Sequence, residues 1–162
     1  MRESEIQFIR QQGFTHVHPD HRLYEALMFQ PRTIAGVLAL GIVFQSPWLF
    51  LALSAVLWLA TAVPTRNLFD AAYNHLVAPA VGVPRLGVAP APRRFAQAMA
   101  ATVSLVIGAA LLAGAMTTAW IFEGLFAIAS TAVVVGRVCA AANVYNRLTG
   151  RADRAASMPR HA

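Results

Sequence analysis

Four apolar runs constrain this chain more than any other feature of its sequence, because together they hold a single charged residue. The runs occupy residues 33–44, 48–63, 95–116 and 119–136. A helix needs about 20 residues to cross the hydrocarbon of a bilayer, so the last two runs are long enough and the first two are short. The first can include the turn before it, because Glu25 and Arg32 can extend their charged ends to the interface. The sequence therefore predicts an all-α integral membrane protein with four transmembrane helices.

The composition agrees with a membrane protein. Only 12% of the residues are charged, whereas a soluble domain has about 25%. The net charge of +6 comes from arginine without lysine, but these arginines flank apolar runs instead of forming the folded basic face of a nucleic-acid reader. We therefore expect no nucleic-acid partner. The single Cys139 excludes an internal disulfide, and no secretory cleavage pattern follows the first run.

The positions of the arginines predict an orientation. They lie before the first run, between the second and third, and at or after the end of the fourth, whereas residues 45–48 and 116–120 have none. Under the positive-inside rule, both termini and the central link are cytoplasmic. The alanine-rich composition is typical of a GC-rich bacterial genome, so the expected location is the bacterial cytoplasmic (inner) membrane. The predicted membrane anchors, basic at the inner face and aromatic at the outer face, are Arg93, Arg94, Arg137, Trp48 and Trp120.

The chain divides into five segments. In order they are an N-terminal cytoplasmic or interfacial arm (1–30), a first helical hairpin with an interfacial helix (31–78), a proline-rich basic cytoplasmic linker (79–94), a second hairpin (95–148) and a flexible basic tail (149–162). The interfacial helix is predicted to lie on the inner membrane surface from its two faces. The apolar face has Leu68, Phe69, Ala72 and Leu76, and the polar face has Arg66, Asn67, Asp70 and Asn74.

An internal repeat relates the two hairpins. A shift of 72 positions aligns residues 48–76 with 120–148 and gives nine identities in 29 positions, among them Trp48 with Trp120 and Tyr73 with Tyr145. One interpretation is a parallel repeat of two hairpins that arose by duplication. The alternative is a shared membrane composition with aromatic belts at matching depths.

Small residues recur at every fourth position in the third and fourth runs. Such stripes let helix backbones approach closely in lipid. They could contact each other or a partner protein. The predicted helix-packing residues are Ala96, Ala100, Ser104, Gly108, Ala132, Gly136 and Ala140.

A histidine-rich stretch near the N-terminus provides the only candidate metal ligands. His16, His18, Asp20 and His21 match the H-x-H-x-D-H ligand motif of the metallo-β-lactamase fold, and imidazole with carboxylate suits zinc or iron. That fold needs a long αββα sandwich, whereas here an apolar run follows closely. The stretch is therefore either a metal site or a polar cytoplasmic arm.

No catalytic constellation is present, so we expect no enzyme. The sequence has no paired carboxylates, phosphate-binding loop or arrangement of nucleophile and base. No histidine lies inside an apolar run, so no haem or chlorophyll ligand is offered at membrane depth. Glu123 is the only acid near a span interior, and ion pathways usually have several ionisable groups. Apart from a metal ion at the histidine stretch, we expect no cofactor.

Three motifs carry a family resemblance. "APAPRRFAQ" at 89–97, "RNLFDAAYNHLVAP" at 66–79 and "GRVCAAANVYNRL" at 136–148 resemble the bacterial membrane family called domain of unknown function 4395, over roughly residues 20–148. The resemblance implies a terminal C-x-x-C motif followed by an aromatic residue. Cys139 and Tyr145 match those positions, but Ala142 replaces the second cysteine. Dithiol exchange needs both thiols.

These features leave three functions open. The first is a non-catalytic structural or accessory subunit that packs against a larger membrane complex, respiratory or photosynthetic. Its partners would be other membrane-protein subunits and anionic lipid at the cytoplasmic face. The second is a thiol- or sulfur-linked membrane component that uses Cys139. The third is a small transporter or a metal-binding protein that uses the arm from His16 to His21.

Overall fold

The computed structural model describes residues 1–14, 21–81, 83 and 85–150, and these residues form helices and loops without a strand. The all-α class is therefore confirmed. The long helices are α2 (His21–Phe44), α3 (Pro47–Ala62), α6 (Ala91–Leu112) and α7 (Met116–Val134). The short ones are α1 (Glu3–Gln11), η1 (Pro64–Arg66), α4 (Leu68–Ala72), the π-helical turn η2 (Tyr73–Val77), α5 (Ala78–Val81) and α8 (Ala140–Leu148).

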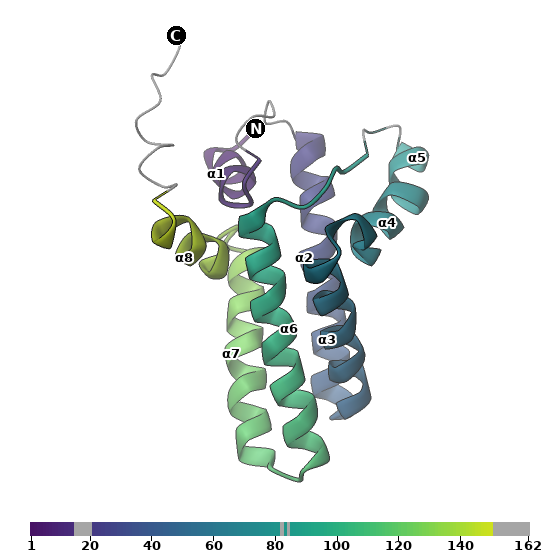
Figure 1. The fold of residues 1–162 in the computed structure, drawn as a ribbon, viewed down its shortest axis with the longest axis vertical. Helices are drawn as coiled ribbons and strands as arrows, with labels where there is room; N and C mark the ends of the chain where they lie inside the picture. Colours follow the sequence, from purple (N-terminus) through teal and green to yellow (C-terminus); the bar gives the residue numbers. More distant parts are fainter. Residues whose placement is uncertain (15–20, 82, 84, 151–162) are drawn as a thin grey trace.

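The four long helices form a bundle along the long axis of the molecule (Figure 1). The contact between α3 and α6 is the most extensive, and α2 packs on both α3 and α7. Buried apolar side chains fill the centre, among them Phe50, Leu57, Ile107 and Phe126. Burial of such side chains between amphipathic or apolar helices is the usual basis of a helical bundle.

Three of the four bundle helices are long and apolar enough to cross a membrane, namely α2, α6 and α7. The first predicted span is longer than its apolar run, because α2 begins at His21 and continues through Pro31 over 24 residues. The second predicted span, α3, has only 16 residues, which is fewer than the about 20 that a helix needs to cross the hydrocarbon. Three candidate spans are thus supported, and a fourth span through α3 stays a prediction.

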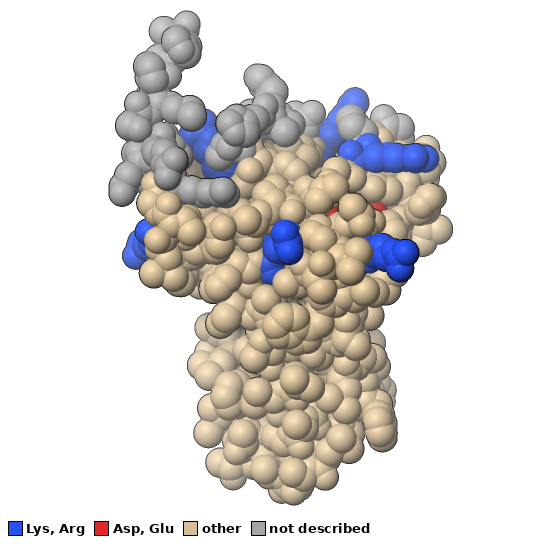
Figure 2. Space-filling view, viewed as in Figure 1, with Lys and Arg blue, Asp and Glu red and all other residues tan. Residues whose placement is uncertain are grey.

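The arginines on the visible face gather at one end of the bundle, which we name the charged end. Figure 2 shows the arginines over the upper part of the visible face, at the level of α1, α4 and α8, whereas the lower part of this face is uncharged. At the charged end a second apolar cluster joins α1, the start of α2, α5 and α8, with Phe8, Leu27 and Tyr73 at its centre. The side of a membrane on which this end lies stays a prediction.

The interfacial segment from α4 to α5 turns part of its polar face toward the protein. Asn67 and Asp70 are buried, whereas Leu68 and Leu76 are 49% and 73% exposed. Phe69 of the predicted apolar face is buried as well, and Arg66 of the predicted polar face is exposed, so burial does not follow the two faces. The physical reason is that the polar side chains find partners inside the protein, while exposed leucines are acceptable where lipid replaces water.

The small residues of α6 pack inside the molecule. A Cβ added at Gly108 would lie 2.8 Å from Cγ of Leu51 in α3. Ser104 is fully buried, and the Ser54 hydroxyl of α3 donates to the carbonyl oxygen of Ala101 at 2.8 Å. By contrast, Ala132 and Gly136 of the second stripe are exposed.

The order of elements is the same in the two halves, each with two bundle helices followed by short helical segments. The shift of 72 places the aligned residues 120–134 within α7 and 140–148 on α8. This correspondence agrees with a parallel repeat, but superposition of the two halves stays a prediction.

Candidate functional site: a buried polar cluster beside an apolar cavity

A buried ion pair joins the interfacial segment to the start of α6. The Arg93 guanidinium donates to both carboxylate oxygens of Asp70, at 2.6 and 3.1 Å. The amide of Asn67 donates to the same carboxylate at 2.8 Å, and its oxygen caps α4 by accepting from the N–H of Phe69. Arg93 is only 4% exposed. The charge of Arg93 is used in a bidentate pair inside the protein, which does not favour the predicted role of Arg93 as a membrane anchor.

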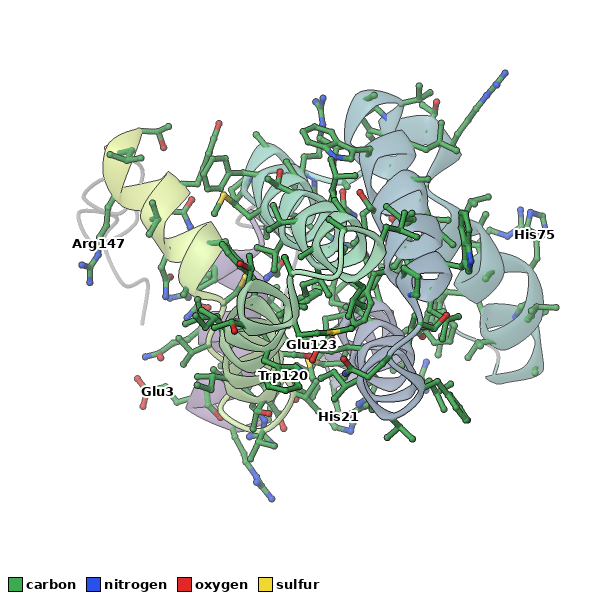
Figure 3. All side chains as sticks on the ribbon, turned by 90° about the horizontal axis from the view of Figure 1, so that it is seen from below. Glu3, His21, His75, Trp120, Glu123 and Arg147 are labelled. Carbon is green, nitrogen blue, oxygen red and sulfur yellow. The ribbon has the colours of Figure 1, made fainter. Side chains whose placement is uncertain are left out.

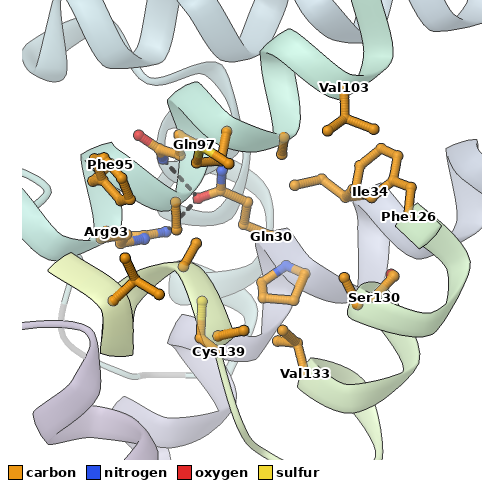
Figure 4. Close-up of a pocket in the computed structure, with 18 of the residues that line it drawn as sticks. Gln30, Ile34, Arg93, Phe95, Gln97, Val103, Phe126, Ser130, Val133 and Cys139 are labelled. Carbon is orange, nitrogen blue, oxygen red and sulfur yellow. Dashed lines mark hydrogen bonds between the residues drawn. The ribbon is translucent and has the colours of Figure 1, made fainter. Parts of the chain in front are cut away.

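Two glutamines extend this pair into the bundle. Arg93 donates to Oε1 of Gln30 at 2.8 Å, and Nε2 of Gln97 donates to the same oxygen at 3.0 Å (Figure 4). A guanidinium can only donate, so the atom of Gln30 that faces it must be the oxygen. That oxygen in turn requires the nitrogen of Gln97 to face it. The orientation of both amides is thus set by the hydrogen-bond network.

The fixed orientations leave two polar atoms unused. In the part of the chain that the structure describes, Nε2 of Gln30 forms no hydrogen bond. Oε1 of Gln97 is buried and also has no partner among the described residues. A buried polar atom without a partner costs about 1 to 3 kcal/mol. We name Asn67, Asp70, Arg93, Gln30 and Gln97 the polar cluster.

An apolar cavity lies beside the polar cluster, between α2, α6, α7 and α8. Its volume is about 460 Å³, within the range of about 300 to 1,000 Å³ that is typical of small-molecule sites. Figure 4 shows Gln30, Arg93 and Gln97 at one side, with Phe126, Ser130 and Val133 at the other. Of the predicted packing residues, Ala96, Ala100 and Ala140 line it.

Arg137 connects the end of α7 to the N-terminal segment. It adopts a φ of 57° and donates to the hydroxyls of Tyr24 and Ser4 at 3.0 and 2.8 Å. It also lies 3.7 Å from the Glu5 carboxylate. The backbone N–H of Arg2 lowers the pKa of Glu5, and the Arg137 charge lowers it further. Arg137 therefore links the end of α7 to α1 and α2, and its role as a membrane anchor stays a prediction.

The remaining predicted anchors fall at the two ends of the bundle. Arg94 donates through Nε and Nη2 to the carbonyl oxygen of Thr61, at 3.1 and 2.9 Å, and so satisfies the last turn of α3. Trp48 and Trp120 are 70% and 62% exposed at the opposite end, where Figure 3 shows Trp120. Their exposure agrees with an anchoring role at the uncharged end, and contact with a membrane stays a prediction.

Glu123 is buried near the uncharged end. Both of its carboxylate oxygens accept from Nε2 of Gln45, at 3.2 and 3.1 Å. Gln45 follows α2 with a φ of 45°, and Figure 3 shows Glu123 within the bundle. This pair ties the α2–α3 turn to α7.

Cys139 is a buried residue at the start of α8. Its backbone N–H donates to Oε1 of Gln11 at 3.0 Å, and its side chain borders the cavity. Burial raises the pKa of the Cys139 thiol, so the reactive thiolate is scarce at neutral pH. Ala142, in the place of the second cysteine of the motif, is fully buried.

We expect the native protein to react with iodoacetamide at pH 7.5 at least about tenfold more slowly than the protein unfolded in dodecyl sulfate, because burial both shields the thiol and disfavours the thiolate. A raised pKa means that the native rate still rises as the pH passes the ordinary value of 9.0, where the rate of a free thiol begins to level off. Since Cys139 is the only cysteine, mass spectrometry of the intact chain measures the rate directly. Equal native and unfolded rates would contradict the burial of this thiol.

The predicted metal site cannot be assembled from the described residues. His16, His18 and Asp20 lie outside them. His21 is exposed, stacks on Tyr24 and has its Nδ1 3.8 Å from Glu5. Within the described ranges no group of three histidine, cysteine or acidic side chains could hold a metal ion. The metal site therefore stays a prediction.

Sequence reasoning missed Gln30, Gln97 and the partnership of Asp70 with Arg93. One signal was present, because Gln97 lies four residues after Arg93 and so shares its helix face, at the start of an apolar run. Neither glutamine carries charge, so an analysis of charge positions passes over both.

Comparison with known proteins agrees with the resemblance of the motifs. A family model described as "Domain of unknown function (DUF4395)" matches residues 25–149. This range contains the whole polar cluster. No curated protein and no solved structure matches the chain.

Proposed function

The chain belongs to the family described as domain of unknown function 4395, and from that premise we propose that it is a non-catalytic integral membrane protein that serves as an accessory subunit of a larger membrane complex. The observation that carries this proposal is the bare outer face of α7. In its most apolar stretch only 17% of the residues are buried, compared with 39% in α6.

The outer face of α7 combines large apolar residues with small ones. In lipid the hydrophobic effect does not drive helices together, because the lipid tails are as apolar as the helix surfaces. Close packing at small residues is therefore a main source of helix association. The corresponding stripe of α6 already packs within the bundle, whereas this one does not. We name as the α7 face the exposed residues Ile121, Gly124, Leu125, Ile128 and Ala132.

We place the charged end of the bundle at the cytoplasmic side of a bacterial inner membrane. The arginine positions support this through the positive-inside rule. Exposed Arg10, Arg22, Arg66, Arg85 and Arg147 would attract anionic lipid by about 1 kcal/mol each near the surface.

The other two candidate functions have less support. A thiol-linked role through Cys139 is opposed by the burial of that side chain. A transporter would need a pathway, but Glu123 is bound to Gln45. The histidine arm stays a separate proposal, which removal of His16, His18 and His21 with measurement of bound metal would test.

Native electrophoresis of gently solubilised membranes, with mass spectrometry of the band that contains a tagged chain, tests the accessory role. We expect the protein to migrate with a defined larger complex. Ala132→Leu on the α7 face should reduce the complexed fraction at least about fivefold, because the branched side chain blocks close helix approach.

Ala109→Leu is the matched control, since Ala109 is an exposed small residue on α6, and it should leave the complexed fraction unchanged. Migration of the wild-type chain near its own mass plus detergent would overturn the proposal. An equal loss in both variants would also overturn the assignment of the α7 face.

A further inference from the structure

The geometry points to the cavity between α2, α6, α7 and α8 as a binding site for one neutral, lipid-soluble molecule with a carbonyl oxygen in its head group. This activity differs from the accessory role, because it concerns the cavity of this chain, which shares only Leu125 with the α7 face. It requires only that the apolar helices lie in a lipid environment.

The hydrogen-bond donor for that oxygen is Nε2 of Gln30. The side chain of Gln30 lines the cavity and is only 4% exposed. Its oxygen is held by Arg93 and Gln97, so its two N–H bonds remain without an acceptor among the described residues. This nitrogen is not one of the fully buried atoms without a partner, which within the described ranges are Oε1 of Gln45 and Oε1 of Gln97, so it is open to the cavity that Gln30 lines. A carbonyl oxygen in the cavity would satisfy it.

The electrostatics of the site favour a neutral head group. Arg93 is the only charged residue that borders the cavity among the described residues, and its charge is matched by Asp70 in a bidentate pair. A second anion would have to compete with Asp70 for the same guanidinium. A cation would meet the N–H bonds of Gln30, which can only donate. Neutral acceptors meet neither obstacle.

The other walls of the cavity are apolar and suit a hydrocarbon chain. Ile34, Val103, Phe122 and Phe126 line the interior, whereas Met99 and Leu125 at its edge are 49% and 57% exposed on the bundle surface. A chain could therefore leave the cavity sideways, toward lipid. The volume of about 460 Å³ fits one small-molecule ligand and not both chains of a phospholipid.

Two kinds of lipid-soluble molecule supply this chemistry, a quinone with an alkyl tail and a single-chain fatty ester. The test uses the purified full chain in detergent and measures one-to-one adducts by native mass spectrometry. The probes are a decyl-substituted benzoquinone, methyl laurate, and decylbenzene, which lacks a carbonyl. We expect at least one carbonyl probe to bind with a dissociation constant about tenfold or more below that of decylbenzene, and the tighter probe identifies the source.

Two variants locate the site. Gln30→Glu keeps an acceptor for Arg93 but removes the N–H donor. It should therefore raise the dissociation constant of the carbonyl probe about tenfold and leave that of decylbenzene unchanged. Ala129→Phe fills the cavity at a lining residue outside the polar cluster, so it should weaken the binding of all three probes. Gln7→Glu, at an exposed position of α1, is the control for added charge.

Absence of a one-to-one adduct with every probe would overturn the inference. Equal affinity for decylbenzene and both carbonyl probes would overturn the role of Gln30, and unchanged binding in Ala129→Phe would overturn the location. If Gln30→Glu does not fold, the probe series and Ala129→Phe still decide. Because the chain is tested alone, failure here is distinct from failure to find a partner complex.

Discussion

Replacing Asp70 by asparagine is expected to lower the free energy of unfolding by about 3 to 5 kcal/mol, the usual cost of removing one partner from a buried ion pair. The shape of the side chain is kept, but the guanidinium of Arg93, with 5% of its side chain exposed, loses the carboxylate that offsets its charge. Denaturant unfolding of the purified protein in detergent, followed by far-UV circular dichroism, measures the change.

Glu25→Gln is the matched control, because Glu25 pairs with Arg32 in a salt bridge whose side chains are 42% and 48% exposed. An exposed pair contributes about 0 to 1 kcal/mol, so the control should remain close to the wild type. The double variant Asp70→Leu with Arg93→Met should recover much of the loss, since no unpaired charge remains. A loss below about 1 kcal/mol in Asp70→Asn would contradict the burial of this pair.

The sequence was sufficient for the class of the protein, and the charge pattern explains why. Apolar runs and the arginines between them are local features, so they predicted α6 and α7 and the uncharged turns close to where the structure has them. The start of α2 was less clear from the apolar run alone, because residues 21–32 mix polar and apolar side chains and include Pro31. Those residues still form helix, since their apolar members pack in the cluster at the charged end.

The roles of Arg93 and Arg137 depend on partners distant in the sequence, which charge positions alone do not reveal. Asp70 lies 23 residues before Arg93, and Ser4 lies 133 residues before Arg137. The burial of Asn67 and Asp70 in the interfacial segment was missed for a related reason. An amphipathic pattern identifies two faces, but where lipid replaces water the apolar face no longer has to point into the protein.

The cavity could not be predicted from the sequence, because its walls come from α2 and, far along the chain, from α6, α7 and α8. Its polar residues come from α2 and α6, and Cys139 and Ala140 reach it from the far end of the chain. The sequence around each of these residues does not mark it as part of a cavity. Only their convergence in space, with the amides oriented by Arg93, produces an unsatisfied donor in apolar surroundings.

Replacing Gly108 by valine is expected to destabilise the protein by about 1 to 3 kcal/mol, the usual cost of overpacking a core. A Cβ at this position would lie 2.8 Å from Cγ and 2.9 Å from Cδ2 of Leu51, and 3.2 Å from the carbonyl oxygen of Pro47. The backbone oxygen cannot move aside without displacing the start of α3. Because the α3–α6 contact is the largest in the bundle, the helices must separate or tilt. The same unfolding measurement in detergent reports the change.

Gly124→Val separates this packing effect from the change in helix propensity, which is the same for both substitutions. Gly124 lies within α7, and a Cβ there would meet nothing within 4 Å, so the expected change is within about 0.5 kcal/mol. Equal destabilisation by the two variants would mean that valine acts through the helix itself. A large effect at Gly124 alone would move the critical contact to the α7 face and away from α3. The pair therefore tests whether the bundle is held by its α3–α6 contact.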